Sequence, residues 1–129
     1  MKHHDKVIWL GDLNFRLRCP AKEARQWAND PTHYRALAKT DELYKAMAAG
    51  LVFSGFDEGA LKFPPTYKYD LNSDQYDTSL KARTPAWTDR ILWRGSRVLL
   101  LAYGSLSSIR ISDHRPVYAV LAFATDSEK

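Results

Sequence analysis

Short apolar runs separated by polar and turn-forming residues make up much of this sequence. Four runs, at residues 7–10, 91–93, 98–103 and 117–123, have the length of β-strands, and most are bounded by Gly, Ser or Pro. The first run is apolar throughout and ends at Gly11, so it predicts a buried strand.

Two helices are expected in the front half of the chain. Residues 21–29 are rich in good helix formers, and Pro31 interrupts the pattern. A second helix is expected over residues 41–49, with Thr40 as its N-cap. Its side chains predicted to face the core are Leu43, Tyr44 and Met47. Helices near the front and strands at the back predict a mixed α/β chain.

Length and composition limit the alternatives. The 129 residues suit one domain, and a hydrophobic content of 45% can supply a core. No apolar run approaches the length of a membrane span, and no signal peptide is evident. The single cysteine, Cys19, excludes an internal disulfide and fits a reducing compartment such as the cytoplasm. We expect the domain to occupy residues 1–124, with a polar tail over residues 125–129.

The positive charge is concentrated in the middle of the chain. The net charge is +4, and residues 61–99 hold seven basic and four acidic side chains. Such an excess is either a solvated surface or a site for phosphate, nucleic acid or an acidic membrane. Charge alone does not decide between them.

Three polar clusters stand at the ends of the predicted strands, at residues 11–16, 85–90 and 112–116. Strand ends hold the backbone rigid while the adjoining loop exposes side chains, which suits a functional site. Each cluster alone also has a structural explanation, such as a turn cap or a surface ion pair. Three together favour function.

The clusters contain the groups needed for metal-assisted phosphoester hydrolysis. Asp12, Asp89 and Asp113 offer the oxygen ligands that Mg²⁺ prefers. Asn14 can orient a phosphoryl oxygen or a water, and a nearby carboxylate would favour the charged form of His114. The cations that can neutralise phosphate are Lys68, Arg83 and Arg90. The sequence has no P-loop, nucleophile elbow or cysteine-rich zinc motif.

Four blocks carry a family resemblance: "WLGDLNFRL", "FPPTYKYD", "KARTPAWTDRILWRG" and "SDHRPVYAV". In order and spacing they resemble the inositol polyphosphate 5-phosphatases, which include the synaptojanins, within the deoxyribonuclease-I-like endonuclease/exonuclease/phosphatase superfamily. The resemblance runs from about residue 6 to residue 123. It implies an α/β fold that forms the C-terminal half of a β-sandwich flanked by helices.

The resemblance also implies roles for individual residues. Asp12 would orient or deprotonate the attacking water, and Asn14 and His114 would hold the scissile phosphate. Asp113 would pair with the site and the metal. Arg16 and Asp89 would support the site, the latter together with Arg90. The residues implied to grip the 4-phosphate of the inositol ring are Tyr67, Lys68, Lys81 and Arg83.

The implied activity is Mg²⁺-dependent hydrolysis of the 5-phosphate of phosphoinositide lipids or soluble inositol polyphosphates. The expected location is the cytoplasm, with peripheral contact to anionic membranes at their cytosolic face. The family's front half normally supplies the principal Glu ligand of Mg²⁺ and an upstream Asn. Neither has a counterpart here, so we expect an incomplete site and a partly uncovered sheet.

Two other functions stay open at this point. A nuclease of the same superfamily shares the Asp-x-Asn and Ser-Asp-His patterns, although the blocks around Tyr67 and Trp87 argue against it. The modest charge excess also argues against a nucleic-acid partner. Alternatively, the chain is an inactive fragment that binds phosphoinositide head groups.

Overall fold

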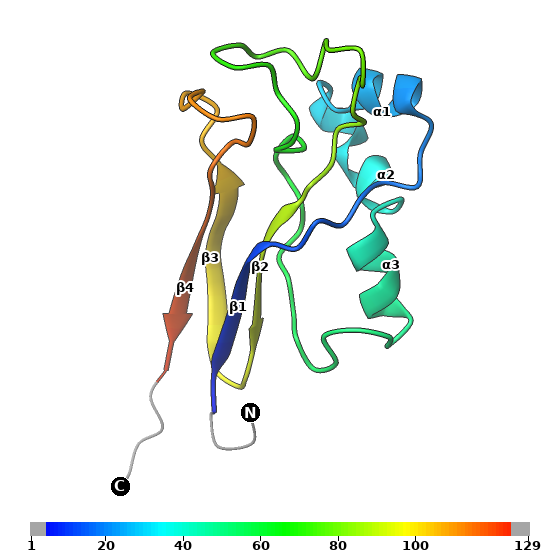
Figure 1. Cartoon of the computed structure of the whole chain (residues 1–129). Helices are drawn as coiled ribbons and strands as arrows, with labels where there is room; N and C mark the ends of the chain where they lie inside the picture. Colours follow the sequence, from blue (N-terminus) through cyan, green and yellow to red (C-terminus); the bar gives the residue numbers. More distant parts are fainter. Residues whose placement is uncertain (1–4, 125–129) are drawn as a thin grey trace, which may run out of the picture.

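The computed structural model describes residues 5–124, so the predicted tail at residues 125–129 lies outside the described part (Figure 1). The strands are β1 (Val7–Asp12), β2 (Asp89–Arg94), β3 (Val98–Ser105) and β4 (Val117–Phe123). The helices are α1 (Ala21–Trp27), the 3₁₀ turn η1 (Pro31–His33), α2 (Tyr34–Ala38) and α3 (Glu42–Ala48). The predicted mixed α/β class is confirmed.

The strands form two antiparallel pairs. β1 pairs with β2, and the register places Asp12 opposite Asp89. β3 pairs with β4, with an irregularity between Leu100 and Ala102. In Figure 1 both pairs run lengthwise through the molecule, and the three α-helices lie to the right of them. The long segment between α3 and β2 carries no regular helix or strand.

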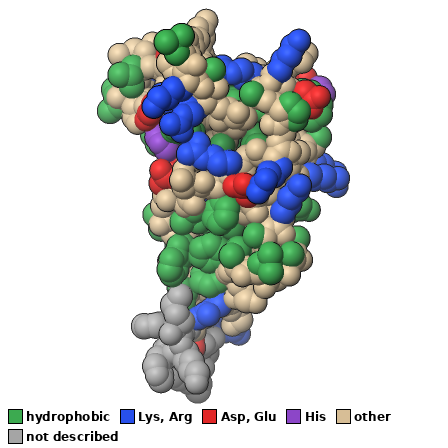
Figure 2. Space-filling view, turned by 45° about the vertical axis from the view of Figure 1, so that its right-hand side comes forward, with side chains coloured by type: hydrophobic (Ala, Val, Ile, Leu, Met, Phe, Trp, Pro, Cys, Tyr) green, Lys and Arg blue, Asp and Glu red, His purple; other side chains and the backbone are tan. Residues whose placement is uncertain are grey.

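All four predicted strands are present, but the predicted burial of the first is wrong. Ile8, Trp9 and Leu10 are 42%, 44% and 65% exposed. Pairing with β2 engages one edge of the β1 backbone, whereas the side chains of β1 have little cover among the described residues. Figure 2 shows hydrophobic side chains gathered on the lower part of one face. This exposure agrees with the expected uncovered sheet.

Helix α3 begins as expected, but its cap is a different residue. The side chain of Asp41 accepts the backbone N–H of Tyr44 at 2.8 Å, whereas the hydroxyl of Thr40 donates to the carbonyl of Leu37. Leu43 is buried as predicted, whereas Tyr44 is 50% exposed. The five-residue helix α2 was not predicted, because it is too short to show a helical period.

The core forms where the helices meet the loop before β2. Trp87 is fully buried, and its indole Nε1–H donates to the carbonyl of Phe63 at 3.0 Å. The backbones of Tyr67 and Ala86 pair in the same region. The core therefore holds the block at 85–90 against the block at 63–70.

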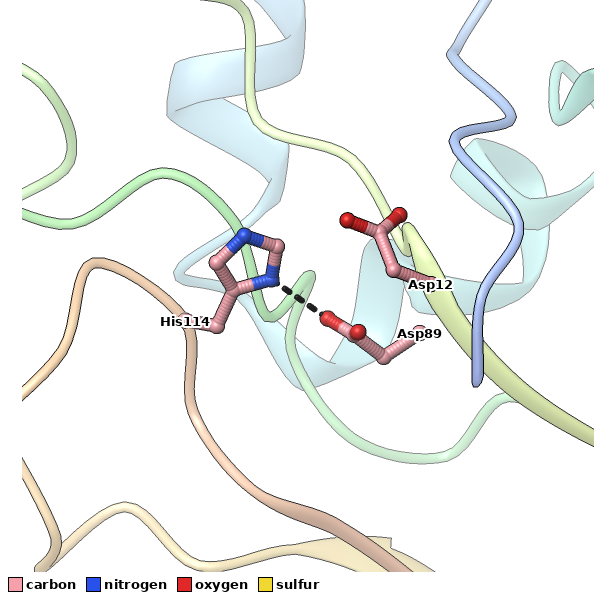
Figure 3. A group of neighbouring side chains, drawn as sticks. All are labelled: Asp12, Asp89 and His114. Carbon is pink, nitrogen blue, oxygen red and sulfur yellow. Dashed lines mark hydrogen bonds and ion pairs between the residues drawn. The ribbon is translucent and has the colours of Figure 1, made fainter. Parts of the chain in front are cut away.

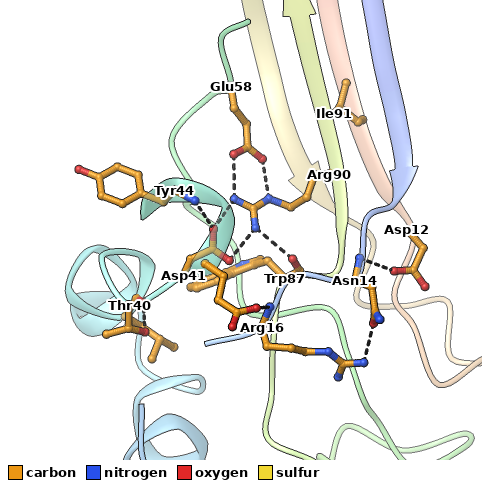
Figure 4. A network of polar contacts seen from close by, with 12 residues as sticks. Asp12, Asn14, Arg16, Thr40, Asp41, Tyr44, Glu58, Trp87, Arg90 and Ile91 are labelled. Carbon is orange, nitrogen blue, oxygen red and sulfur yellow. Dashed lines mark hydrogen bonds and ion pairs between the residues drawn. The ribbon is translucent and has the colours of Figure 1, made fainter. Parts of the chain in front are cut away.

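Arg90 belongs to this buried region, which corrects its prediction as a phosphate-binding residue. It is 1% exposed, and its guanidinium contacts both carboxylate oxygens of Asp41 at 2.8 Å and those of Glu58 at 2.7 and 2.8 Å (Figure 4). It also donates to the carbonyl of Trp87. All three guanidinium nitrogens thus have protein acceptors, and the residue links β2 to the start of α3.

No described helix is long and apolar enough to span a membrane.

Candidate active site

A histidine–aspartate pair lies at the start of β2. The Nδ1 atom of His114 is 2.5 Å from the Oδ2 atom of Asp89 (Figure 3). Asp89 is the first residue of β2, and His114 lies in the loop shortly before β4. The hydroxyl of Thr88 is 3.2 Å from the same carboxylate oxygen and 3.4 Å from Nδ1. This pairing fixes the ring so that its other nitrogen, Nε2, is available to a ligand.

The electrostatics of the pair favour a protonated imidazole. The hydrogen bond to Asp89 raises the pKa of His114 above its ordinary value, against the lowering effect of partial burial. The negative charges of Asp89, Asp113 and Asp12 add to the rise. The sequence-based expectation that carboxylates favour the charged form of this histidine is confirmed in direction.

A tight turn after β1 places two more polar groups beside the pair. Asp12 Oδ1 accepts the backbone N–H of Asn14 at 3.0 Å, and Asn14 has a positive φ of 59°. The backbone N–H groups of Leu13 and Asn14 both reach the carbonyl of Thr88. Arg16 then donates to the side-chain oxygen of Asn14 at 2.6 Å (Figure 4). The turn is therefore tied to β2, and Arg16 orients the Asn14 amide.

Tyr67 covers one side of the site. Its ring centroid lies 4.7 Å from that of His114, and the guanidinium of Arg16 lies 4.8 Å from the Tyr67 ring centroid. Its backbone pairs with both Ala86 and His114. These contacts bring the block at 63–70 to the other three blocks, so side chains distant in sequence surround one region.

The oxygen and nitrogen donors include a candidate metal site. Single ligand atoms of Asp12, Asp89 and His114 lie within 4.8 Å of one another (Figure 3). Asp113, the predicted metal ligand, is outside this group, and its carboxylate is 3.9 Å from Nε2 of His114. Asp12 and Asp89 are therefore the carboxylates that the geometry groups for a metal, and each also has a protein partner, the Asn14 N–H for Asp12 and the His114 ring for Asp89. Two carboxylates suit Mg²⁺, which usually keeps several waters and also binds substrate phosphate.

The predicted phosphate-binding cations lie on the loops that lead into the site. Lys68 is half-buried, and its Nζ is 3.7 Å from Asp77, while Lys81 and Arg83 are exposed. Sequence analysis did not single out Asp77, a buried acid within this basic segment. Its signal was the spacing to Ser79, since Asp side chains often accept the backbone N–H two residues later.

Two hollows mark the surface. One of about 360 Å³ is lined by residues of β1 and β2 together with Ser112, His114 and Val117, so it adjoins the histidine–aspartate pair. A larger hollow of about 1010 Å³ lies between the helices and residues 56–62. Of the predicted site residues, only Arg90 borders the larger one, so the smaller hollow is the better candidate for a reacting group.

Comparison with protein families gives one match over most of the chain. Residues 1–120 match the model of endonuclease/exonuclease/phosphatase family 2. The chain belongs to this family. Among curated relatives it is similar to the polyphosphatidylinositol phosphatase INP53 of Saccharomyces cerevisiae, at 45% identity over 98% of this chain. It is also similar to the synaptojanin of Caenorhabditis elegans, at 47% identity over 95% of this chain. The predicted resemblance to inositol polyphosphate 5-phosphatases is confirmed.

Two solved structures that resemble this chain agree with the fold. A synaptojanin inositol polyphosphate 5-phosphatase domain, in complex with inositol (1,4)-bisphosphate and calcium, matches with a TM-score of 0.86 and 44% identity over 91% of this chain. A Cimex nitrophorin, solved as a ferrous NO complex, matches at 0.80 and 36% identity over the same share. The likeness to a nitrophorin means that the fold does not by itself decide the chemistry.

The matched region is a part of each relative. This chain spans 12% of the yeast phosphatase, 11% of the nematode synaptojanin and 34% of the solved synaptojanin chain. It spans 41% of the nitrophorin chain. The blocks that form the site all lie within residues 1–120, which match the family model.

Proposed function

We propose that this chain carries the phosphate-handling part of an enzyme that hydrolyses the 5-phosphate of phosphoinositides or soluble inositol polyphosphates. The observation that supports it most is that Asp12, Asn14, Asp89 and His114 lie close together, and that Asp89 and His114 line one hollow. The names of the relatives support the substrate class, since they are polyphosphatidylinositol and inositol phosphatases.

In the proposed reaction, a water attacks phosphorus while the bond from phosphorus to the inositol oxygen breaks. Asp12 accepts the proton of the water at Oδ2, because its Oδ1 is engaged by the Asn14 N–H. The departing inositol oxygen takes a proton from solvent water, and Asp12 afterwards returns the proton it accepted to solvent. Asn14, held by Arg16, directs its amide to a phosphoryl oxygen. These groups are preorganised by backbone contacts, so little reorganisation is needed during the reaction.

His114 serves as a cationic hydrogen-bond donor in this scheme. Its protonated Nε2 donates to a phosphoryl oxygen, where negative charge builds up as the bonds rearrange. Asp89 stabilises that charge through Nδ1 and holds the ring in place. Asp89 is a positioning residue, because it acts on the phosphate only through His114.

We further propose that the enzyme depends on Mg²⁺, with Asp113 as the ligand that the family resemblance implies from this chain. When bound, the ion would supply charge neutralisation at the phosphoryl oxygens. The solved relative with calcium supports a divalent ion in this family. Tyr67, Lys68 and the exposed cations Lys81 and Arg83 would hold the 4-phosphate. A cytoplasmic location with peripheral contact to anionic membranes fits this substrate.

The test compares substrates under one set of conditions. With this chain in its full-length context and Mg²⁺ present, phosphate release is measured from inositol 1,4,5-trisphosphate and from vesicles containing phosphatidylinositol 4,5-bisphosphate. Cleavage of plain and abasic duplex DNA is measured alongside. The proposal expects phosphate release and no DNA cleavage. Binding of inositol (1,4)-bisphosphate is measured in parallel, because the inactive-fragment alternative predicts binding with no release.

The variant Lys68→Ala/Arg83→Ala tests the 4-phosphate assignment. We expect a greater loss with inositol 1,4,5-trisphosphate than with an inositol phosphate that lacks the 4-phosphate. An equal loss on both would remove these cations from the 4-phosphate site. Cleavage of DNA without release of phosphate would replace the proposal with the nuclease alternative.

A further inference from the structure

The loop at residues 77–83 carries two of the cations assigned above to the 4-phosphate. Lys81 and Arg83 are both exposed, and the loop has no helix or strand of its own. Exposed lysine and arginine side chains lose conformational freedom when they bind, so a weakly held loop gives weak and unselective binding. The residues that hold this loop in one conformation therefore affect how selectively the site binds its ligand.

The side-chain carboxylate of Asp77 accepts hydrogen bonds from the backbone of its own loop. Its Oδ1 accepts the backbone N–H of Ser79 at 2.9 Å, and its Oδ2 accepts the backbone N–H of Arg83 at 2.7 Å. The same Oδ2 lies 3.7 Å from Nζ of Lys68, which comes from the neighbouring block. One carboxylate thus joins both ends of the loop to the third cation.

Burying the Asp77 carboxylate beside a phosphate-binding site is unfavourable unless its contacts with the loop compensate. Asp77 is 1% exposed, and an acid placed beside a phosphate site repels the ligand. Hydrogen bonds from Ser79 and from the backbone of Arg83 hold the pKa of Asp77 well below its usual range. It is therefore charged at neutral pH, and its contacts with the loop offset the cost of its burial.

Arg25 holds the same loop from outside. This residue of α1 donates through Nη2 to the carbonyl oxygen of Asp77 at 2.5 Å and to that of Arg83 at 3.2 Å. Because it contacts both ends of the loop, it repeats the closure made by the Asp77 carboxylate. Helix α1 is 52 residues away from Asp77 in sequence, so the contact is a tertiary one.

We propose that Asp77 and Arg25 are positioning residues that hold Lys68, Lys81 and Arg83 in the arrangement that binds a second ring phosphate. Through these cations they set the preference of the site for inositol rings that carry a phosphate besides the one hydrolysed. This inference rests on the proposed function. Neither residue touches the ligand, since the carboxylate faces the loop backbone and the guanidinium faces two carbonyl oxygens.

The test measures a ratio of affinities for the full 129-residue chain. Calorimetric titration compares inositol (1,4)-bisphosphate with inositol 1-phosphate, and the ratio of the two dissociation constants reports the second phosphate. Asp77→Asn keeps one acceptor oxygen, but it places an NH₂ group opposite one of the two backbone N–H donors, so that hydrogen bond is lost. We expect this change to reduce the preference roughly tenfold, as expected for a lost charged hydrogen bond. Asp57→Asn is the matched control, because Asp57 is exposed and distant from the loop in sequence.

A second variant guards against a folding defect in the first. Arg25→Ala changes a partly exposed side chain and leaves the buried carboxylate intact. It is expected to reduce the same ratio by several-fold, whereas Arg35→Ala, at an exposed site on α2, leaves it unchanged. Thermal unfolding of each variant confirms that it is folded. A purely structural role would weaken both ligands equally and leave the ratio unaltered.

The outcomes separate the two levels of the proposal. If the wild-type chain prefers the bisphosphate and both variants keep that preference, the positioning roles of Asp77 and Arg25 are refuted while the proposed function stands. If the wild-type chain binds neither ligand, or binds both equally, the assignment of the cations is wrong, and the positioning roles fall with it.

Discussion

Asp89 and Arg90 are neighbours at the start of β2, and their surroundings differ sharply. Asp89 is partly exposed and contacts His114 beside a hollow at the surface. Arg90 is buried on the opposite side of the strand between Asp41 and Glu58. Successive side chains of a strand point to opposite faces, so one dipeptide serves both the site and the core.

Asp89 and Arg90 show that two adjacent residues can serve the candidate site and the core separately. Around Asp89 the polar groups keep atoms available, such as Nε2 of His114 and one oxygen of Asp12. Around Arg90 every guanidinium nitrogen is satisfied by the protein. Mutations on the two sides should therefore separate activity from stability.

The largest expected effect is on activity. Asp12→Asn and His114→Gln should each reduce phosphate release by a factor of about 10²–10⁴, the usual contribution of a positioned acid or base. At a pH well above the pKa of His114, their unfolding midpoints should stay close to wild type, because Asp12 is exposed and His114 is partly exposed. Retained turnover in either variant would remove that residue from the chemistry.

The core side of β2 should show the opposite behaviour. Arg90→Met leaves Asp41 and Glu58 buried without a cation, which should cost about 3–5 kcal/mol of unfolding free energy. Urea unfolding measures the loss, with Arg35→Met as an exposed control. A cost below about 1 kcal/mol would mean that the buried ion cluster adds little to stability.

Arg16 lies between these extremes. It contacts Asn14 and the ring of Tyr67, and it is partly exposed, so Arg16→Ala should cost about 0.5–1 kcal/mol of stability. Because it orients the Asn14 amide, turnover should fall more than stability does. Unchanged turnover in this variant would show that the Asn14 amide does not need Arg16 to orient it.

The smallest effect is expected on the exposed face of β1. Leu10→Ala should change unfolding free energy by about 0.5 kcal/mol or less, because Leu10 is already 65% exposed. The same substitution at Leu92, which is fully buried on β2, should cost about 2–5 kcal/mol. Equal costs at both positions would mean that Leu10 is covered in solution.

Sequence alone predicted the strands and the four blocks that meet, because apolar runs and motifs are local properties. It did not predict which side of β2 each polar residue occupies, and Arg90 was wrongly assigned to phosphate binding. The partners that bury Arg90 are Asp41 and Glu58, at 49 and 32 residues' distance. Such pairing depends on tertiary packing, which no local pattern contains.

The helix cap and the burial of β1 failed for related reasons. Thr40 and Asp41 are both good caps, and the choice depends on Asp41 also meeting Arg90. The apolar run of β1 predicts a strand, but cover for its faces depends on what packs there. Asp77 was missed because it is one of four acids in residues 61–99, and nothing local distinguishes it from a solvated charge.

Segments distant in sequence bring their acids to His114, and titration of the His114 imidazole tests this arrangement most directly. The raised pKa of His114 means that its protonation stabilises the folded chain. That contribution is fully present below the unfolded value of about 6.5 and is lost as pH rises through the higher folded value. Stability should therefore decline across that window.

Nuclear magnetic resonance of the His114 ring in wild type, Asp89→Asn and Asp12→Asn is the decisive measurement. We expect a raised pKa of His114 in wild type, a clear fall toward the ordinary value in Asp89→Asn, and a smaller fall in Asp12→Asn. An imidazole that titrates identically in all three proteins would contradict this expectation, because the acids would then not lie beside the histidine.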